Sequence, residues 1–183
     1  MSEKYPIDFV VTWVDGNDPV WQAEKAKYSP NKNADNRNVR FRDWDNMQYW
    51  FRAVEKFAPW VNKVHFVTYG HLPKWLNTNN PKLNIAKHSD FIPKEYLPTF
   101  SSRTIEFNLH RIKGLAERFV YFNDDMFLLK PVKRELFFAG KDCLPTDFAI
   151  TSTLSVTDKK DTVQYAKFNN IVILNSHFDK KEQ

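Results

Sequence analysis

The sequence predicts an α/β protein in which a mainly parallel sheet is flanked by helices. Short runs rich in β-branched and aromatic residues alternate with longer segments whose apolar residues recur at helical spacing. This alternation is typical of parallel sheets, because neighbouring parallel strands need a crossover segment, usually a helix, between them. The chain has 183 residues, of which 42% are hydrophobic, and this is enough for one domain with a well-filled core.

The first strand is predicted over residues 7–14, a run of mostly β-branched and aromatic residues. It opens into Asp15-Gly16-Asn17-Asp18-Pro19, whose Asp-Gly and Asp-Pro steps are typical of turns. A short helix over residues 21–27 and a polar loop over residues 29–38 follow. The two aspartates are candidates either for binding a ligand beyond the strand or for capping the next segment.

The middle of the chain contains a long helix and two strands. Apolar residues at helical spacing predict the helix over residues 43–57, and Pro59 ends it. Strands are predicted over residues 64–68 and 83–87, with one helical turn at residues 73–76 between them. The alternation of strand and helix therefore continues through this region.

The next region leads to a fourth strand. Two prolines keep residues 92–100 extended or turn-like. Ser101 or Ser102 is expected to cap a helix over residues 103–115, since a serine hydroxyl accepts a hydrogen bond from the first free N–H groups of a helix. The fourth strand is predicted over residues 119–122.

The last part of the chain is less regular. We expect a short helix over residues 132–138 and a strand over residues 147–151. The apolar residues 165–175 fit either a helix or a strand. The α/β domain is expected to span residues 1–150, followed by a C-terminal extension over residues 151–183.

Two adjacent carboxylates follow the fourth strand directly, in Asn123-Asp124-Asp125. Carboxylates without partners cannot continue a buried strand, because burying an unpaired charge is very costly. Open α/β sheets bind ligands at the carboxyl ends of their strands, and hard oxygen ligands there suit Mg²⁺ or Mn²⁺ bound to a substrate phosphate. Asp15 and Asp18 end another strand in the same way. The alternative for the tripeptide is an Asx-type turn without a metal.

The helix before the fourth strand carries polar residues on one face. Arg103, Glu106 and His110 are spaced i, i+3 and i+7, which places them on one side of a helix. Arg103 is a candidate for a bidentate phosphate contact. Glu106 is a candidate general base or partner of a metal ligand, and His110 is a candidate base or proton shuttle. The alternative is an ordinary amphipathic helix with an intrahelical ion pair.

Composition excludes several classes of site. With only 4 glycines, the chain has no GxGxxG and no P-loop sequence. Cys143 is the only cysteine, which excludes an internal disulfide and a thiolate zinc cluster. The polar residues 1–6 do not read as a signal peptide, and no run approaches the about 18 apolar residues of a membrane span. We therefore expect a cytoplasmic protein without a transmembrane segment.

The net charge is +5, and much of the positive charge lies between Lys25 and Arg42. Such a cluster attracts phosphates, nucleic acid or anionic lipid headgroups, or is simply a solvated loop. A nucleic-acid-binding module is one alternative function. The acids, however, gather at strand ends and no base-stacking sheet is evident, so we expect no nucleic-acid partner.

Residues 7–19 are similar to the first region of one known family, and nearly everything from Arg40 through Leu128 is similar to its second region. The most similar pieces are Arg40-Phe41-Arg42-Asp43, Ala58-Pro59-Trp60-Val61, Pro73-Lys74-Trp75-Leu76, Leu97-Pro98-Thr99-Phe100-Ser101-Ser102, Ile105-Glu106, His110-Arg111-Ile112 and Tyr121-Phe122-Asn123-Asp124-Asp125. The family that they resemble is Stealth. It comprises sugar-1-phosphate transferases, among them bacterial capsular polysaccharide phosphotransferases and the catalytic subunit of animal N-acetylglucosamine-1-phosphotransferase.

The resemblance implies a glycosyltransferase-A-like fold that binds a nucleotide-diphosphate sugar, most simply a UDP-sugar. It implies transfer of a hexose-1-phosphate to a hydroxyl of an oligo- or polysaccharide in capsule or exopolysaccharide synthesis. A lipid-linked acceptor would place the enzyme at the inner membrane face. Asp124 and Asp125 would hold Mg²⁺ or Mn²⁺. The residues expected to contact the donor are Asp15, Gly16, Asp18, Arg42, Ser102 and Asn123, and the catalytic candidates are Arg103, Glu106 and His110.

The chain also departs from the family pattern. Some relatives carry Asn where this chain has Ser101 and Arg103, which leaves the role of Arg103 open. Two further family motifs, one with a functional histidine, are not found, so a truncated relative that binds the donor without full activity is one alternative. A conventional metal-dependent glycosyltransferase on the same sheet is another, and it would release UDP instead of UMP.

Overall fold

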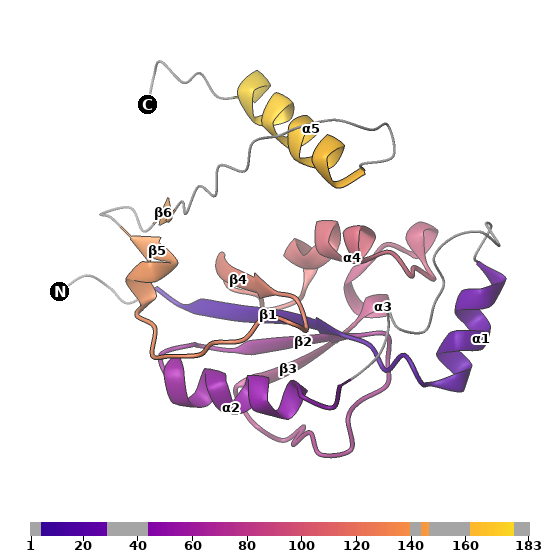
Figure 1. Ribbon diagram of the computed structural model, residues 1–183, viewed down its shortest axis with the longest axis horizontal. Helices are drawn as coiled ribbons and strands as arrows, with labels where there is room; N and C mark the ends of the chain where they lie inside the picture. The colour runs from indigo at the N-terminus through magenta and orange to yellow at the C-terminus, as the bar shows by residue number, and fades with distance from the viewer. Residues whose placement is uncertain (1–4, 29–43, 140–143, 147–161, 178–183) are drawn as a thin grey trace. The chain divides into compact units, whose positions relative to one another are not determined.

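The computed structural model describes residues 5–28, 44–139, 144–146 and 162–177 (Figure 1). The chain forms two compact units, Met1–Pro145 and Thr146–Gln183. In the second unit, residues 162–177 form a helix, α5 (Thr162–His177). The apolar segment that fitted a helix or a strand is therefore helical.

The first unit is built on a four-stranded sheet. Its strands are β1 (Ile7–Trp13), β2 (Val64–Thr68), β3 (Leu83–Lys87) and β4 (Arg118–Phe122). The strand order is β3-β2-β1-β4, and all three pairings are parallel. The predicted α/β class with a parallel sheet is confirmed. Because the chain proceeds from β1 to β2 and β3 on one side and returns to place β4 on the other, the topological switch point lies between β1 and β4.

Helices cover both faces of the sheet, as Figure 1 shows. On one face, α2 (Met47–Phe57) buries Met47, Trp50 and Val54 in a core with residues of β1 and β2. On the other face, buried residues from β1, β2 and β3 pack with Phe91 of α3 (His88–Phe91) and with residues that follow α4 (Ser102–Asn108). Both faces of β1 and β2 are therefore covered by apolar residues, as expected for central parallel strands.

A buried polar network closes the amino ends of the strands. Asp8 of β1 accepts hydrogen bonds from His65 Nε2 at 2.9 Å, Asn62 Nδ2 at 2.8 Å and the backbone N–H groups of Lys63 and Ala116 at 3.0 and 2.8 Å. His65 Nδ1 accepts a hydrogen bond from Asn84 Nδ2 of β3 at 2.9 Å. The carboxylate thus ties β1 to β2 and to the segment before β4, and the carboxyl ends of the strands are left for a ligand.

Several predicted elements differ in the structure. The helix expected over residues 103–115 is α4 followed by a 3-10 turn, Leu109–Arg111. The side chain of Asn108 donates to Thr104 O at 2.8 Å where the α-helix ends, and such side-chain bonds compete with helix continuation. The helix expected over residues 132–138 is also wrong: Arg134–Leu136 form a 3-10 turn, and β5 (Phe138–Ala139) pairs with β6 (Leu144–Pro145).

Other boundaries shift less. Helix α1 (Pro19–Lys27) begins two residues before the predicted start, and α2 begins at Met47 instead of residue 43. The short helix α3 and a 3-10 turn, Lys94–Tyr96, were not predicted. The loop expected at residues 29–38 and the strand expected at residues 147–151 lie outside the described residues.

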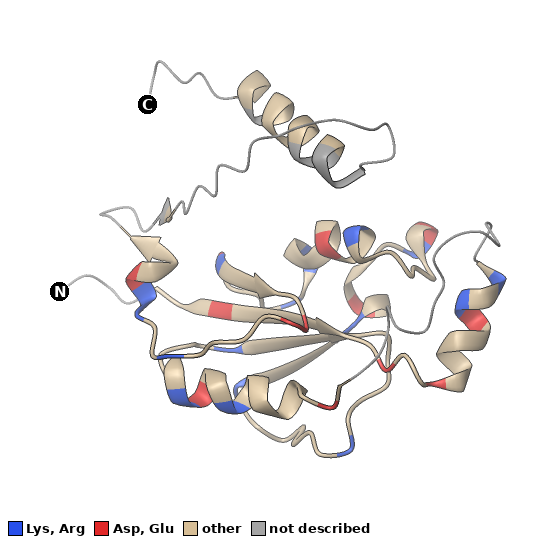
Figure 2. Cartoon of the chain, viewed as in Figure 1, with Lys and Arg blue, Asp and Glu red and all other residues tan. Residues whose placement is uncertain are grey.

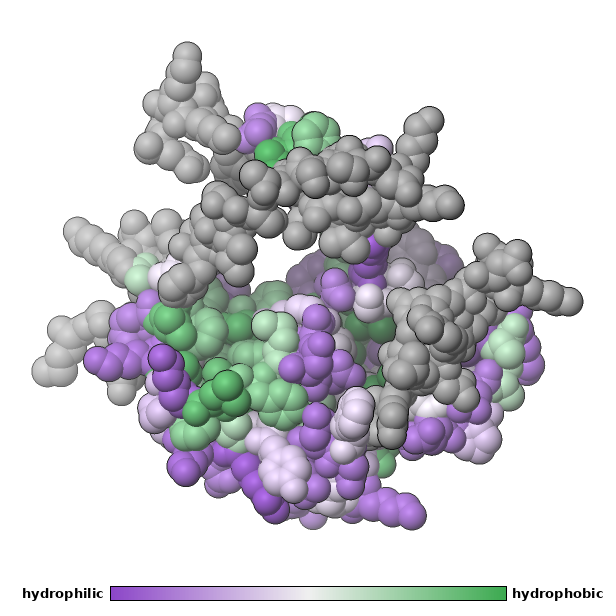
Figure 3. Space-filling view, viewed as in Figure 1, coloured by the Kyte–Doolittle hydropathy of each residue, from purple (hydrophilic) through white to green (hydrophobic). Residues whose placement is uncertain are grey.

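An apolar area is visible on the face shown in Figure 3, over the segment that leads from β4 to β5. Met126, Leu129 and Leu136 of this segment are exposed. Among the described residues, no helix is both long and apolar enough to cross a membrane.

Candidate donor site at the switch point

A cavity of about 500 Å³ opens at the carboxyl ends of β1 and β4, the position where open α/β sheets bind ligands. One part of its wall is polar and acidic, and another part is aromatic. The polar part contains Ser102, Glu106, Asn123, Asp124 and Asp125. Five of the residues predicted for the site therefore line one cavity, although β4 and α4 contribute them from separate segments. Figure 2 shows acidic positions both on α4 and directly after β4.

Tyr121 connects the elements that form this polar part. Its hydroxyl donates to Asn123 Oδ1 at 2.7 Å, lies 3.4 Å from Glu106 Oε1 and is 3.2 Å from Thr12 Oγ1 of β1. Burial raises the pKa of Tyr121 to about 12, and the nearby Glu106 carboxylate acts in the same direction. The phenol therefore stays protonated near neutral pH and orients its partners as a hydrogen-bond donor.

The donor atoms at the end of β4 fit a hard divalent cation. Asp124 and Asp125 are exposed and offer carboxylate oxygens, and both line the cavity. In the part of the chain that the structure describes, no cluster of three or more His, Cys, Asp or Glu side chains forms a complete metal cage. Mg²⁺ is commonly held by one or two carboxylates together with waters and substrate phosphates. Two adjacent carboxylates in an open cavity match that kind of site.

Arg103 and His110 do not line the cavity. Both are exposed, and Ser101 rather than Ser102 caps α4, because the Ser101 hydroxyl accepts from Thr104 N. The prediction for His110 assumed seven further residues of regular helix after Arg103. The α-helix ends at Asn108, so this spacing does not extend to His110. The catalytic roles of Arg103 and His110 stay predictions.

The acidic loop after β1 is held by its own hydrogen bonds. Asp18 Oδ1 caps α1 by accepting from Val20 N at 2.8 Å and Trp21 N at 3.0 Å, and these bonds lower the pKa of Asp18. His71 Nε2 accepts from Asp15 N at 2.8 Å, and its Nδ1 lies 3.3 Å from Asp18 Oδ2. The neutral tautomer of His71 therefore carries its proton on Nδ1, toward Asp18.

The other donor-binding predictions have different outcomes. Asp15, Gly16 and Asp18 do not line the cavity, and the carbonyl oxygen of Gly16 accepts from Gln22 Nε2 at 2.6 Å. Arg42 lies outside the described residues. Contact between these four residues and a donor stays a prediction.

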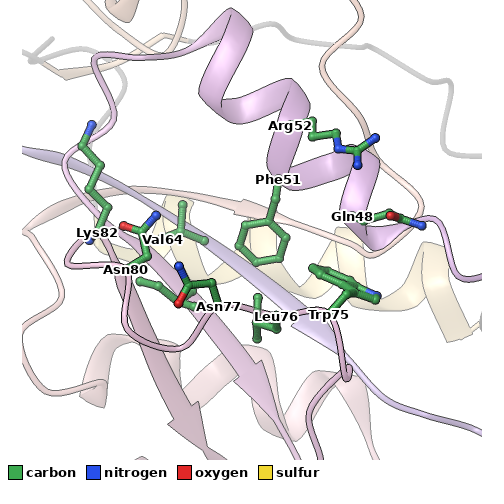
Figure 4. A pocket seen from close by; sticks show the side chains of 10 residues that line it. Gln48, Phe51, Arg52, Val64, Trp75, Leu76, Asn77, Asn80 and Lys82 are labelled. Atoms are coloured by element: carbon green, nitrogen blue, oxygen red, sulfur yellow. Dashed lines mark hydrogen bonds between the residues drawn. The ribbon is translucent and has the colours of Figure 1, made fainter.

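A second cavity, of about 300 Å³, lies beside α2 (Figure 4). Phe51 of α2 points toward Leu76 and Trp75, and Asn77 and Asn80 come from the segment before β3. Its described lining residues include no aspartate or glutamate. Because it offers no carboxylate for a cation, the cavity at the switch point is the better candidate for a diphosphate.

Comparison with protein families agrees with this geometry. The model described as Stealth protein CR1, conserved region 1, matches residues 5–33, and Stealth protein CR2, conserved region 2, matches residues 40–144. The chain belongs to the Stealth family. The resemblance noted from the sequence is confirmed, and the parallel sheet with flanking helices agrees with the glycosyltransferase-A-like class expected for a Stealth protein.

Curated Stealth relatives are named as phosphotransferases. The chain is 54% identical to the capsular polysaccharide phosphotransferase WcwK of Streptococcus pneumoniae over 96% of this chain and 53% of the relative. It is 48% identical to the capsular polysaccharide phosphotransferase CpsJ of Streptococcus thermophilus over 96% of this chain and 74% of the relative. It is 44% identical to the exopolysaccharide phosphotransferase cps2G of Lactiplantibacillus plantarum over 98% of this chain and 52% of the relative. This Stealth chain thus spans about half the length of WcwK and cps2G.

Tyr121 and His88 are among the cavity residues to which the sequence analysis gave no site role. Tyr121 lies within the strand predicted over residues 119–122, and His88 directly follows the strand predicted over residues 83–87. Tyr121 shares a face of its strand with Phe119, so the alternation of side chains identified its direction but not its hydroxyl contacts. No local signal places His88 beside Phe100 and Trp21, because three separate segments meet there.

Proposed function

We propose that the Met1–Pro145 unit binds a nucleotide-diphosphate sugar and takes part in the transfer of its hexose-1-phosphate to an acceptor sugar hydroxyl. The observation that carries this proposal is the joint placement of Glu106, Asn123, Asp124 and Asp125 in one cavity at the topological switch point. The names of the Stealth relatives support the reaction class. The simplest donor is a UDP-hexose, and the acceptor is a capsular or extracellular polysaccharide chain.

Asp124 and Asp125 would hold Mg²⁺ or Mn²⁺, which when bound would neutralise charge on the diphosphate. Asn123, fixed by the Tyr121 hydroxyl, presents its amide N–H groups as neutral donors beside the carboxylates. Ser102 is exposed and lines the same cavity, and its hydroxyl would contact the donor. These side chains bind and orient the donor at the strand ends.

The reaction is displacement at phosphorus. The oxygen of an acceptor hydroxyl forms a bond to the phosphorus nearer the sugar, and the bond from this phosphorus to the bridging oxygen breaks. The nucleoside monophosphate leaves with the bridging oxygen, and the product is a phosphodiester between the two sugars. The acceptor proton needs a base within hydrogen-bond reach. Glu106, the carboxylate on the α4 wall of the cavity, is our candidate for this role.

Product analysis tests the proposal. The protein is incubated with Mg²⁺, an acceptor oligosaccharide and, in turn, the UDP derivatives of glucose, galactose, N-acetylglucosamine and N-acetylgalactosamine. Phosphorus NMR is expected to show a phosphodiester and UMP with one donor. Release of UDP with no phosphodiester would indicate a conventional glycosyltransferase, and formation of neither product with any donor would contradict transfer by this chain.

A further inference from the structure

The aromatic part of the donor cavity contains Trp21, His88 and Phe100. The Trp21 and Phe100 ring centroids lie 5.8 Å apart at an angle of 67°, and Tyr69 stacks on Phe100 at 5.9 Å and 27°. Tyr69 also packs edge-on against His88 at 6.0 Å. Aromatic rings line this end of the cavity, and they suit a flat, neutral ligand group better than a phosphate.

The imidazole of His88 has an unusual position in this cluster. The residue is only 9% exposed, and its Nδ1 atom is buried without a hydrogen-bond partner among the described residues. The residue lines the cavity, so its other ring nitrogen, Nε2, is the one that a ligand bound there would meet. Buried polar groups are normally paired, and an unpaired one needs an explanation.

The charge state and the tautomer of His88 follow from its surroundings. Burial lowers the pKa of His88 to about 4, and the nearby His71 acts in the same direction. The ring is therefore neutral at pH 7 and carries one proton. A buried N–H without an acceptor costs more than an unused lone pair, so the proton belongs on Nε2. His88 thus offers a neutral N–H donor to the cavity.

The two ends of the cavity are far enough apart for the two ends of a nucleotide. His88 follows β3 directly and Asn123 follows β4 directly. These strands are separated by three strand spacings in the order β3-β2-β1-β4, or about 14 Å. An extended nucleoside diphosphate can reach from one to the other, with its diphosphate at Asp124 and Asp125 and its base at the aromatic end.

Building on the function proposed above, we propose that His88 recognises the nucleobase of the donor. Its Nε2–H donates a hydrogen bond to a ring carbonyl oxygen of the base, while the base lies in the Trp21–Phe100 environment. A neutral N–H donor beside aromatic rings matches a carbonyl acceptor. Uracil has two such oxygens, whereas adenine has none. His88 therefore favours a carbonyl-bearing base, because adenine offers only ring nitrogens as acceptors, at positions that differ from those of the uracil oxygens.

The experiment compares two variants of His88. His88→Phe keeps a flat ring but removes the N–H, whereas His88→Gln keeps an N–H donor near the position of Nε2. Binding of UDP, ADP and inorganic pyrophosphate is measured by calorimetry in Mg²⁺, with thermal unfolding as the check on folding. His88→Phe is expected to weaken UDP binding about 10-fold, to reduce the preference for UDP over ADP by a similar factor and to leave pyrophosphate binding unchanged. His88→Gln is expected to stay within about threefold of the unaltered protein for all three ligands.

The outcomes separate this inference from the proposed function. In His88→Phe, equal losses of UDP and pyrophosphate binding, or an unchanged preference for UDP over ADP, would overturn base recognition by His88 alone. If the unaltered protein bound neither UDP nor pyrophosphate, the proposed function and base recognition by His88 would both be overturned. Nitrogen NMR of the free protein at pH 7 gives an independent result: a proton on Nε2 is expected, and a proton on Nδ1 would overturn the inference.

Discussion

The hydroxyl of Tyr121 lies 2.7 Å from Asn123 Oδ1 and donates its single proton to it, while Glu106 Oε1 lies farther away at 3.4 Å. Tyr121 of β4 therefore fixes the side chain of Asn123, the first residue after the strand. Thr12 of β1 lies 3.2 Å from the same hydroxyl, so the contact also crosses the switch point. A rigid arrangement of this kind favours binding of a ligand in one orientation.

Tyr121→Phe is expected to reduce the kcat/KM for transfer about 10-fold, because Asn123 loses the hydrogen bond that orients its amide. The aromatic ring stays in place, so the free energy of unfolding should change by less than about 1.5 kcal/mol. Steady-state kinetics and urea unfolding measure the two quantities. A variant with unaltered kinetics would show that the hydroxyl does not organise the site.

Glu106→Gln tests the general base. The substitution keeps the size of the side chain but removes its basicity, and kcat is expected to fall by about 10²-fold or more. Affinity for UDP in Mg²⁺ should remain within a few-fold of the unaltered protein, because the proposed role concerns the acceptor proton. Glu95→Gln, an exposed glutamate outside the cavity, is the matched control. An equal effect of both substitutions on kcat would remove Glu106 from the mechanism.

Asp8→Ala is expected to cost about 3 kcal/mol of unfolding free energy, because it removes the shared acceptor and leaves buried donors of the network unpaired. Glu95→Ala, which removes an exposed carboxylate, should change the same quantity by about 0.5 kcal/mol or less. Urea unfolding of the two variants gives the comparison. Similar values for both would mean that the network contributes little to stability.

The Asp8 carboxylate also predicts how the free energy of unfolding depends on pH under acidic conditions. Burial alone would raise the pKa of Asp8, but hydrogen bonds from His65, Asn62 and Ala116 outweigh it and hold the pKa below its ordinary value of 3.8. A lowered folded-state pKa gives stability that is present above pH 3.8 and is lost as the pH falls through the folded-state pKa. The unfolding free energy of the unaltered protein should therefore fall more steeply below pH 3.8 than that of Asp8→Asn. An equal pH dependence of the unfolding free energy in the two proteins would contradict this assignment.

Asp18 has a cap role in the structure and a predicted donor-binding role, and two substitutions separate them. Asp18→Ala should lower the free energy of unfolding by about 1 kcal/mol, whereas Asp18→Asn should retain most of it, because asparagine is also a good N-cap. Thermal unfolding measures this difference. A loss of UDP affinity in Asp18→Asn, without a loss of stability, would assign donor binding to the charge. Equal destabilisation by both substitutions would contradict the cap role.

Strong local patterns account for the parts of the fold that the sequence predicted well. The mostly apolar run of β1 and the Asn-Asp-Asp sequence after β4 identified both the strands and the edge where the cavity lies. Their carboxyl ends meet because the strands are parallel, which is a general property of such sheets. The polar part of the site was therefore accessible from the sequence.

The errors fall where tertiary contacts or side-chain bonds override local periodicity. The apolar spacing after Arg103 predicted a helix that continues through residue 115, but the side chain of Asn108 bonds to Thr104 O where α4 ends. His110 consequently left the predicted face. His88 was missed for a different reason: its neighbours Trp21 and Phe100 are distant in sequence and meet it only in the folded unit.

The most direct test of the account is a crystal structure of the protein with UDP and Mn²⁺, in which anomalous scattering locates the metal. The account predicts a manganese peak within coordination distance of Asp124 or Asp125, with the diphosphate bound to the same ion at the carboxyl ends of β1 and β4. A nucleotide bound elsewhere, with both carboxylates turned to solvent and no manganese beside them, would contradict it.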